Sequence, residues 1–181
     1  MNAPRFATDR LLLVPLVKED ATQIQAVFPQ WEIVRYLAAS FPWPFPDDGA
    51  WRFVNNIALP QAEKGSGWFW TIRRKEEPEN IIGLITLSDQ PDNHRGFWLD
   101  PAWQRQGLMT EASRCVTDFW FNTLHREVLR APKASDNEGS RKMSMNSGMR
   151  LIRVEKKQFI AGELDAELWE ITREEWNRLA H

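Results

Sequence analysis

Midway along the chain the sequence adopts the two-residue period of β-strands, and this change most limits what the chain can fold into. Residues 68–73 and 81–87 are rich in Trp, Phe, Ile and Leu, and they flank turn-forming residues at 77–80. A third run follows at 96–99, and residues 107–124 then carry apolar side chains at helical spacing. The pattern predicts three consecutive antiparallel strands that lead into a long helix.

Shorter elements are predicted on both sides of this segment. Apolar runs bounded by Pro, Gly and Asp predict a mixture of strands and helices. No internal repeat, low-complexity tract or long linker divides the chain, so we expect one domain over residues 1–181 with an α+β fold. The predicted elements are a strand at 11–14, helices at 18–28, 32–39 and 48–58, a strand at 128–131, a helix ending near 148, and strands at 152–160 and 168–171.

Charge and composition exclude several classes of protein. The formal charge is -2 and the sequence pI is near 6.0, so no basic field is available to attract a nucleic acid. Cys115 is the only cysteine, which excludes an intrachain disulfide and a zinc site built from thiolates, and no metal is expected. Without an apolar leader or a membrane span, we expect a cytoplasmic protein. Cys115 lies on the apolar stripe of its helix and is predicted to be buried and unreactive.

Residues 95–112 carry the chemistry. They are predicted to form a strand, a turn that contains Gly107, and the start of a helix. Such a turn presents several unpaired backbone N–H groups at the positive end of a helix, and it therefore binds anions. Pyrophosphate is the natural ligand, because main-chain donors satisfy its charge without a lysine or a metal. The sequence is neither a P-loop nor the three-glycine dinucleotide motif.

At this turn the chain resembles the GNAT superfamily of N-acetyltransferases. The family signature is Gln or Arg, two variable residues, Gly, one variable residue, and then Gly or Ala. Residues 104–109 match this signature, with Met109 in place of the final small residue. Residues 96–101, the Thr-Glu-Ala sequence at 110–112 and the opening residues 8–13 resemble the RimJ/RimL-like branch, which acetylates ribosomal-protein N-termini. The resemblance implies binding of acetyl-CoA as co-substrate.

A second match lies downstream, where the same branch carries Asn, then Ser three positions later, then Gly followed by an aromatic residue. Here these positions are Asn137, Ser140, Gly148 and Met149, so the aromatic residue is missing. Each matched residue also has a purely structural interpretation: Gly107 as a tight-turn glycine, Asn137 as a helix N-cap, and Ser140 as a surface residue.

The resemblance implies a GNAT fold, with a mostly antiparallel central sheet of about six to seven strands and about four flanking helices. The sheet is expected to splay after its fourth strand, and the pantetheine arm to lie in the gap as a false strand. The coenzyme-binding residues implied are Phe97, Trp98, Leu99, Gln104, Arg105, Gln106, Gly107, Leu108, Met109, Thr110, Asn137 and Ser140.

Catalysis is implied to be direct attack of an amine on the thioester. In many GNAT enzymes a tyrosine seven positions after the asparagine protonates the thiolate, but here that position is Ser144, and the only tyrosine is Tyr36. The thiolate is therefore expected to leave unprotonated or to be served by Ser140, Ser144 or water. For the base, Asp89 is the first choice, ahead of Glu111 and His94, although an aspartate before Gln90-Pro91 is also a common turn former.

The sequence thus predicts an acetyl-CoA-dependent N-acetyltransferase for a primary amine, which is a peptide N-terminus or a small molecule. Two other classes stay open: a GNAT-like domain that binds acyl-CoA without efficient turnover, and a non-enzymatic module that uses a surface rich in tryptophan. The chain has ten tryptophans. A homodimer is also left open. Neither nucleic acid nor a membrane is expected as a partner.

Overall fold

The computed structural model describes residues 1–179, in which eight strands form two separate antiparallel sheets. The first sheet has five strands in the order β1-β2-β3-β4-β5, and the second has three in the order β6-β8-β7. The predicted splay of the sheet is thus found, but it follows the fifth strand instead of the fourth, and the sheets have eight strands instead of six to seven. The strands are β1 Phe6–Ala7, β2 Leu11–Pro15, β3 Gly67–Arg74, β4 Glu77–Ser88, β5 Arg95–Leu99, β6 Val128–Ala134, β7 Arg150–Phe159 and β8 Gly162–Thr172.

The helices follow the predicted order, with differences at their ends. A π-helical segment, Phe53–Ala58, joins α3 to α4, and a second one, Phe119–Thr123, extends α5. Helix α7 was not predicted, although Thr172 and Glu175 form a capping box at its start. The α-helices are α1 Ala21–Val27, α2 Trp31–Val34, α3 Gly49–Arg52, α4 Leu59–Glu63, α5 Leu108–Asp118, α6 Glu138–Asn146 and α7 Arg173–Arg178.

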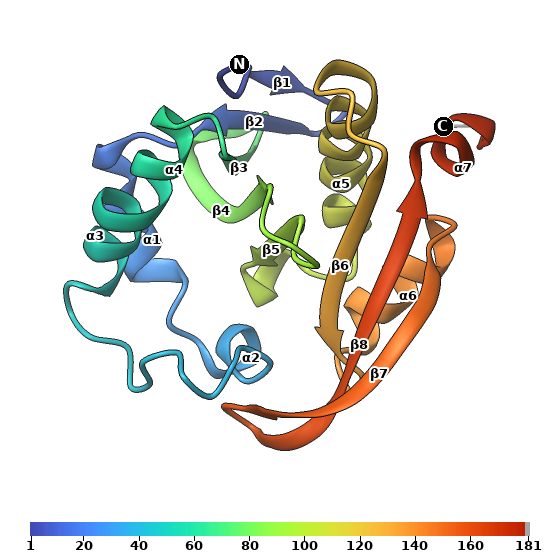
Figure 1. The fold of residues 1–181 in the computed structure, drawn as a ribbon. Helices are drawn as coiled ribbons and strands as arrows, with labels where there is room; N and C mark the ends of the chain where they lie inside the picture. Colours follow the sequence, from blue (N-terminus) through green and yellow to red (C-terminus); the bar gives the residue numbers. More distant parts are fainter. Residues whose placement is uncertain (180–181) are drawn as a thin grey trace.

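Two apolar cores lie on opposite faces of the five-stranded sheet. Figure 1 shows α1, α3 and α4 beside one face and α5 beside the other. Because β3 and β4 lie in the interior of this sheet, their side chains are buried on both faces. Trp68 and Trp70 of β3 pack with α5, and Phe69 between them packs with the helices on the other face. The sheet therefore holds α5, and the turn before it, in a fixed place.

The hairpin between β3 and β4 turns earlier than predicted. The turn is at Lys75 and Glu76, and β4 begins at Glu77. Arg74 pairs with Glu77 and Arg73 with Ile81, so residues 78–80 form a bulge. Because residues 78–80 have no pairing partner in β3, the missing N–H group of Pro78 leaves no hydrogen bond of the ladder unmade. The irregular residues were identified correctly, but they interrupt the strand instead of forming its turn.

Aromatic residues divide between the interior and the surface. In the Pro-rich loop at 41–46, Phe41 and Phe45 stack with ring centroids 5.7 Å apart against the core, while Trp43 is exposed beside Trp31. Cys115 is half-buried against the α5 core, and burial raises the pKa of its thiol to about 11, so it is not a nucleophile at neutral pH. No helix within residues 1–179 is long and apolar enough to cross a bilayer.

Candidate functional site

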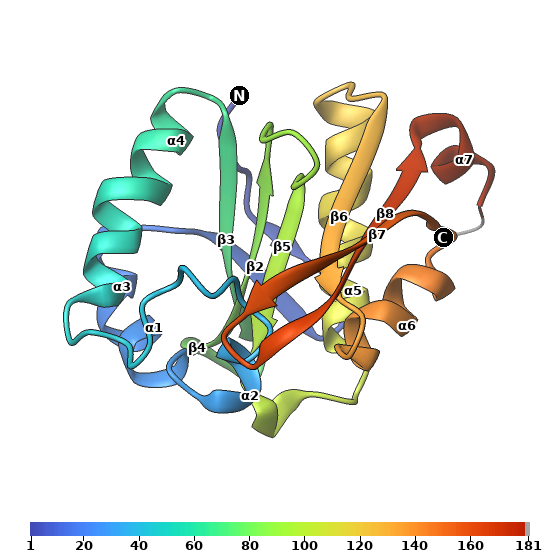
Figure 2. The same ribbon diagram turned by 60° about the horizontal axis from the view of Figure 1, so that its bottom comes forward.

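The site is a gap between β5 and β6, the strands at which the two sheets face each other (Figure 2). The strands are joined at one end, where the His94 N–H donates to the Arg130 carbonyl at 2.9 Å. The Arg130 N–H donates in turn to Nδ1 of His94, also at 2.9 Å. Over the rest of their length, β5 and β6 form no ladder within the described residues. The gap therefore opens toward Leu99 and Ala134.

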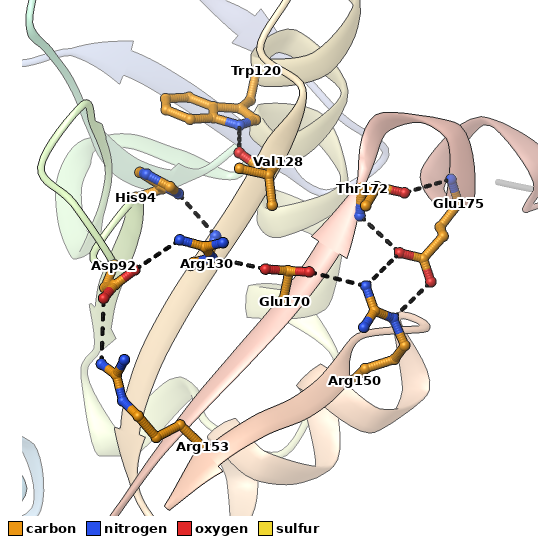
Figure 3. Close-up of polar contacts among 10 residues, drawn as sticks. All are labelled: Asp92, His94, Trp120, Val128, Arg130, Arg150, Arg153, Glu170, Thr172 and Glu175. Carbon is orange, nitrogen blue, oxygen red and sulfur yellow. Dashed lines mark hydrogen bonds and ion pairs between the residues drawn. The ribbon is translucent and has the colours of Figure 1, made fainter.

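A chain of ion pairs, which we call the sheet clasp, holds the closed end of the gap (Figure 3). Asp92, in the loop before β5, binds Arg130 of β6 at 3.1 Å and Arg153 of β7 at 3.3 Å. Glu170 of β8 binds Arg130 at 2.8 Å and Arg150 of β7 at 3.0 Å. A clasp at one end only fixes where the sheets meet and leaves the other end free to separate.

The last link of the clasp predicts how stability changes with pH. Bidentate hydrogen bonds from Arg150, and then the Thr172 N–H, lower the pKa of Glu175 from 4.5 to about 2. Because the folded pKa is the lower one, this stabilisation is complete above about pH 4.5 and is lost as the pH falls toward 2. We expect Glu175→Gln to cost about 1 kcal/mol at pH 7 and almost nothing near pH 2, measured by urea unfolding. A cost independent of pH would contradict the assignment.

The free edge of β5 presents main-chain groups to the gap. The Asp100 N–H donates to the Ile82 carbonyl of β4 at 2.8 Å, so alternate residues of β5 face β4 and the others face away from it. Phe97 and Leu99 therefore direct their main-chain groups into the gap, and the main chain of Trp98 faces β4. The Leu99 carbonyl already accepts from the Gln104 side chain at 2.8 Å.

The turn after β5 has the backbone that an anion site requires. Arg105 and Gly107 both have positive φ angles, 66° and 80°, and Gly107 is the N-cap of α5. The first-turn N–H groups of α5 have no acceptor within the helix and lie next to an exposed turn. Met109 packs against the α5 core. Its side chain is thus directed away from the turn, so the departure from the family signature leaves the turn open.

Arg10 and Glu111 brace this turn against the first hairpin. Arg10 Nη1 donates to the Gln106 carbonyl at 2.9 Å, and Arg10 Nε lies 2.9 Å from Glu111 Oε1. Burial alone raises the pKa of Glu111, but hydrogen bonds from Thr8 and Arg10 lower that pKa overall. Glu111 is therefore a charged brace with its oxygens occupied, which does not suit a general base.

A cavity of about 150 Å³ continues from the turn between α5, α6 and α7. Thr110, the third residue of α5, lies at its wall together with Arg114, Asn146 and Trp176. The lining therefore combines an aromatic ring, hydrogen-bonding groups and a cation. Such a lining suits a base, a sugar and a phosphate.

The matched residues of α6 lie beside the gap. The Asn137 side chain accepts from the Ser140 N–H at 3.4 Å, so Asn137 is an N-cap as its structural interpretation predicts. Ser140 and the fully buried Ser144 both accept hydrogen bonds from Lys133 of β6. The side of the gap formed by β6 is thus polar where β6 packs against α6.

This geometry is that of a known family. The sequence profile of the acetyltransferase (GNAT) domain matches residues 10–150. The chain belongs to the GNAT acetyltransferase family. An uncharacterised N-acetyltransferase of Bacillus subtilis, YoaA, is 28% identical over 149 residues, which cover 80% of this chain and 82% of that protein.

Solved structures share this GNAT fold at low sequence identity. The ribosomal-protein-S5-alanine acetyltransferase of Vibrio fischeri superposes with a TM-score of 0.80 at 18% identity, over 96% of this chain and 98% of that one. Mycobacterium smegmatis RimJ, in complex with a CoA disulfide, has a TM-score of 0.80 at 16% identity, over 94% and 88%. The GNAT fold, with its RimJ/RimL-type structural neighbours, is thus confirmed.

Two of the predicted catalytic groups lie away from the open part of the GNAT gap. Both Asp89 carboxylate oxygens accept from Arg126 at 2.9 Å, next to the clasp. Nδ1 of His94 accepts the Arg130 N–H, which places the ring proton on Nε2, and burial lowers the His94 pKa. Asp89 and His94 are therefore bound to residues at the closed end of the gap, which they help to hold together.

Two residues beside the gap, Lys133 and Tyr36, were not among the predicted site residues. Lys133 shares the inward face of β6 with Leu129 and Ala131, and this alternation of buried positions was a readable signal. Tyr36 is distant in sequence, yet its hydroxyl donates to the Asp136 carbonyl at 3.0 Å, next to the N-cap of α6. No local pattern indicates that contact. No group of three His, Cys, Asp or Glu side chains in the described part of the chain is placed to hold a metal.

A strap crosses the open side of the gap. Residues 35–39, which were predicted to continue the second helix, instead pair with the β7–β8 hairpin. The Ala39 N–H donates to the Gln158 carbonyl, and the Ile160 N–H to the Leu37 carbonyl, both at 2.9 Å. Main-chain bonding to the hairpin therefore replaces the last turns of the predicted helix. Figure 2 shows α2 and this hairpin side by side.

Proposed function

We propose that the chain transfers the acetyl group of acetyl-CoA to the primary amine at a protein N-terminus. One observation carries the proposal: the unpaired edge of β5 leads, through a short 3-10 helix at Pro101–Trp103, into a positive-φ turn at Gly107 that opens α5. An extended amide chain fits the edge, and a pyrophosphate fits the turn. Pantetheine joined to pyrophosphate combines both in one molecule.

The coenzyme follows this path in three parts. The pantetheine amides pair with the gap-facing main chain of Phe97 and Leu99. The pyrophosphate binds the N–H groups from Arg105 to Thr110, and the adenosine end enters the cavity beside Arg114. The bound CoA in the structural neighbour RimJ supports the choice of ligand.

Acetyl transfer in this site is direct. A neutral amine attacks the thioester carbon, and the Phe97 N–H, which faces the gap, donates to the carbonyl oxygen as it gains charge. Holding the amine and the thioester together replaces a bimolecular encounter with reaction inside one complex. The tetrahedral intermediate then collapses, and the CoA thiolate leaves.

The strap side of the gap suits a peptide acceptor. Trp31 and Trp43 are 46% and 37% exposed, with ring centroids 6.5 Å apart next to the strap. Exposed aromatic pairs bind chain segments at low entropic cost. Two structural neighbours are acetyltransferases of ribosomal proteins, which favours a protein N-terminus over a small amine. The cytoplasmic location and a homodimer stay predictions of this proposal.

The test is thiol release with matched acceptors. Decapeptides that begin with Ala or Ser should release CoA thiol and gain one acetyl group by mass spectrometry. The same peptides with a blocked N-terminus are the control and should give neither signal. Acetylation of polyamines or free amino acids, but of no peptide, would show that the acceptor is a small amine. Acetyl-CoA binding without release to any amine would support the non-turnover alternative.

A further inference from the structure

We propose that Lys133 is the proton source for the departing CoA thiolate and that it acts through the hydroxyl group of Ser144. This inference rests on the proposed acetyl-CoA function. Lys133 lies in β6, and Ser144 lies in α6 at the position where many GNAT enzymes carry a tyrosine. A serine hydroxyl alone is a poor acid, whereas a serine that accepts from an ammonium group can pass a proton on.

The Lys133 ammonium is held entirely by neutral oxygens. It is 8% exposed, and its Nζ donates to the carbonyl and the hydroxyl of Ser140, both at 3.2 Å. Its third bond goes to the hydroxyl of Ser144, which is fully buried. Three donors therefore meet three acceptors, and both hydroxyls belong to the α6 residues that were predicted to serve the thiolate.

Within residues 1–179, no carboxylate binds Lys133. Its cross-strand neighbour on β8 is Glu167, which is 5% exposed. Both Glu167 oxygens accept from Arg141 Nε, at 3.1 and 3.2 Å, and one also accepts from Trp169 Nε1 at 3.0 Å. Glu167 is thus already neutralised by another cation.

A second buried cation faces Lys133 from the other side of the gap. Arg95 of β5 is 4% exposed, and its Nη1 donates to Thr117 of α5 at 2.8 Å. Its Nε has no hydrogen-bond partner within the described residues. The groups around Lys133 are therefore Arg95 from β5, Glu167 from β8, and Arg141 and the serines from α6. Two buried cations without a free buried anion suit a site where negative charge develops.

This environment prepares Lys133 to release a proton. Burial first, and then Arg95, lowers the pKa of Lys133 to about 7, while Glu167 opposes the shift. An acid is most effective when its pKa lies near the working pH. A free thiol has a pKa of about 8.5, so proton transfer from this ammonium group to a thiolate is favourable.

The step balances as follows. The amine nitrogen forms a C–N bond to the acetyl carbon, and the C–S bond breaks with its electron pair on sulfur. The Ser144 hydroxyl gives its proton to the sulfur and takes one from Lys133 Nζ, which becomes neutral. The proton released by the acylated amine passes through water and restores the ammonium before the next turnover.

Product binding tests this inference without an acceptor. Calorimetric titration at pH 8 compares CoA with desulfo-CoA, which lacks only the sulfur. We expect wild type to bind CoA up to about tenfold more tightly, the upper end of what one hydrogen bond to the sulfur contributes. Lys133→Met should remove the difference, while Lys142→Met, on the exposed side of α6, should retain it. An equal preference in Lys133→Met and wild type would overturn the inference.

The pH profile of kcat gives the second readout, with the peptide acceptor that responds in thiol release. Wild-type kcat should fall as the pH rises above about 7. Lys133→Arg keeps the positive charge, but a guanidinium group does not release its proton. The kcat of this variant should therefore be about 100-fold lower and should lose the alkaline limb, the fall in kcat above about pH 7. Ser144→Ala should do the same, and it should also remove the preference for CoA over desulfo-CoA. A limb that persists in Lys133→Arg, or disappears in Tyr36→Phe, would contradict the role of Lys133. If wild type binds no CoA, the proposed function itself fails.

Discussion

Gly107→Glu is expected to weaken acetyl-CoA binding at least 100-fold while leaving the fold largely intact. Gly107 caps α5 at a φ of 80°, where a side chain costs about 1–2 kcal/mol, and its built Cβ would lie 3.5 Å from Arg10 Nη2. The larger effect is chemical, because a carboxylate would stand where the pyrophosphate binds. Calorimetric titration of acetyl-CoA measures the loss.

A second glycine separates strain from lost binding. Gly65 has a φ of 71° with no atom within 4 Å of a built Cβ, and it lies in the turn before β3. Gly65→Glu should therefore cost similar backbone strain and leave acetyl-CoA affinity unchanged. Equal acetyl-CoA affinity in Gly107→Glu and wild type would show that the pyrophosphate does not bind at this turn.

Phe97→Pro is expected to lower kcat with acetyl-CoA about 100-fold, the effect of losing one donor to a developing oxyanion. The Phe97 N–H faces the gap, so a proline there keeps the β4–β5 ladder and removes only the donor that faces the thioester. Main-chain pairing with pantetheine is lost at the same point, and the KM for acetyl-CoA should rise about tenfold.

Phe97→Val is the matched control. It removes the same aromatic ring from the α5 core but retains the N–H group and suits a strand. Its kcat should stay within a few-fold of wild type, measured by thiol release with the peptide acceptor and with the melting temperature of both variants as a fold check. Similar kcat values for Phe97→Pro and Phe97→Val would show that this N–H has no part in the reaction.

Local patterns predicted the parts of the fold that depend on local forces. The apolar strand segments of β3 and β4, the stop at Pro29 and the turn at Gly107 all depend on residues within a few positions of the chain, and the structure confirms them. The interruption at Pro78 was recognised but placed in the turn, because a bulge depends on the register with the partner strand. The two-residue strand β1 is too short to leave a periodic signal.

Contacts between distant segments account for what the sequence did not predict. The join at the closed end of the gap depends on Arg130, which pairs with Asp92 and Glu170 from other elements. The predicted base Asp89 meets Arg126, 37 positions away, and no local pattern indicates that pair. The alternation along β6 places Lys133 on the inward face, but its hydrogen-bond partners come from α6, which only the packing of α6 against β6 brings there.

The binding of acetyl-CoA tests the central claim most directly. Titration of acetyl-CoA into the wild-type chain by calorimetry at pH 7.5 should give one site per chain with a dissociation constant between about 1 μM and 1 mM, the usual range for an enzyme substrate. Gly107→Glu should bind at least 100-fold more weakly under the same conditions. Absence of binding to the wild-type chain at about 1 mM acetyl-CoA would contradict the coenzyme site, and the acetyl transfer proposed from it.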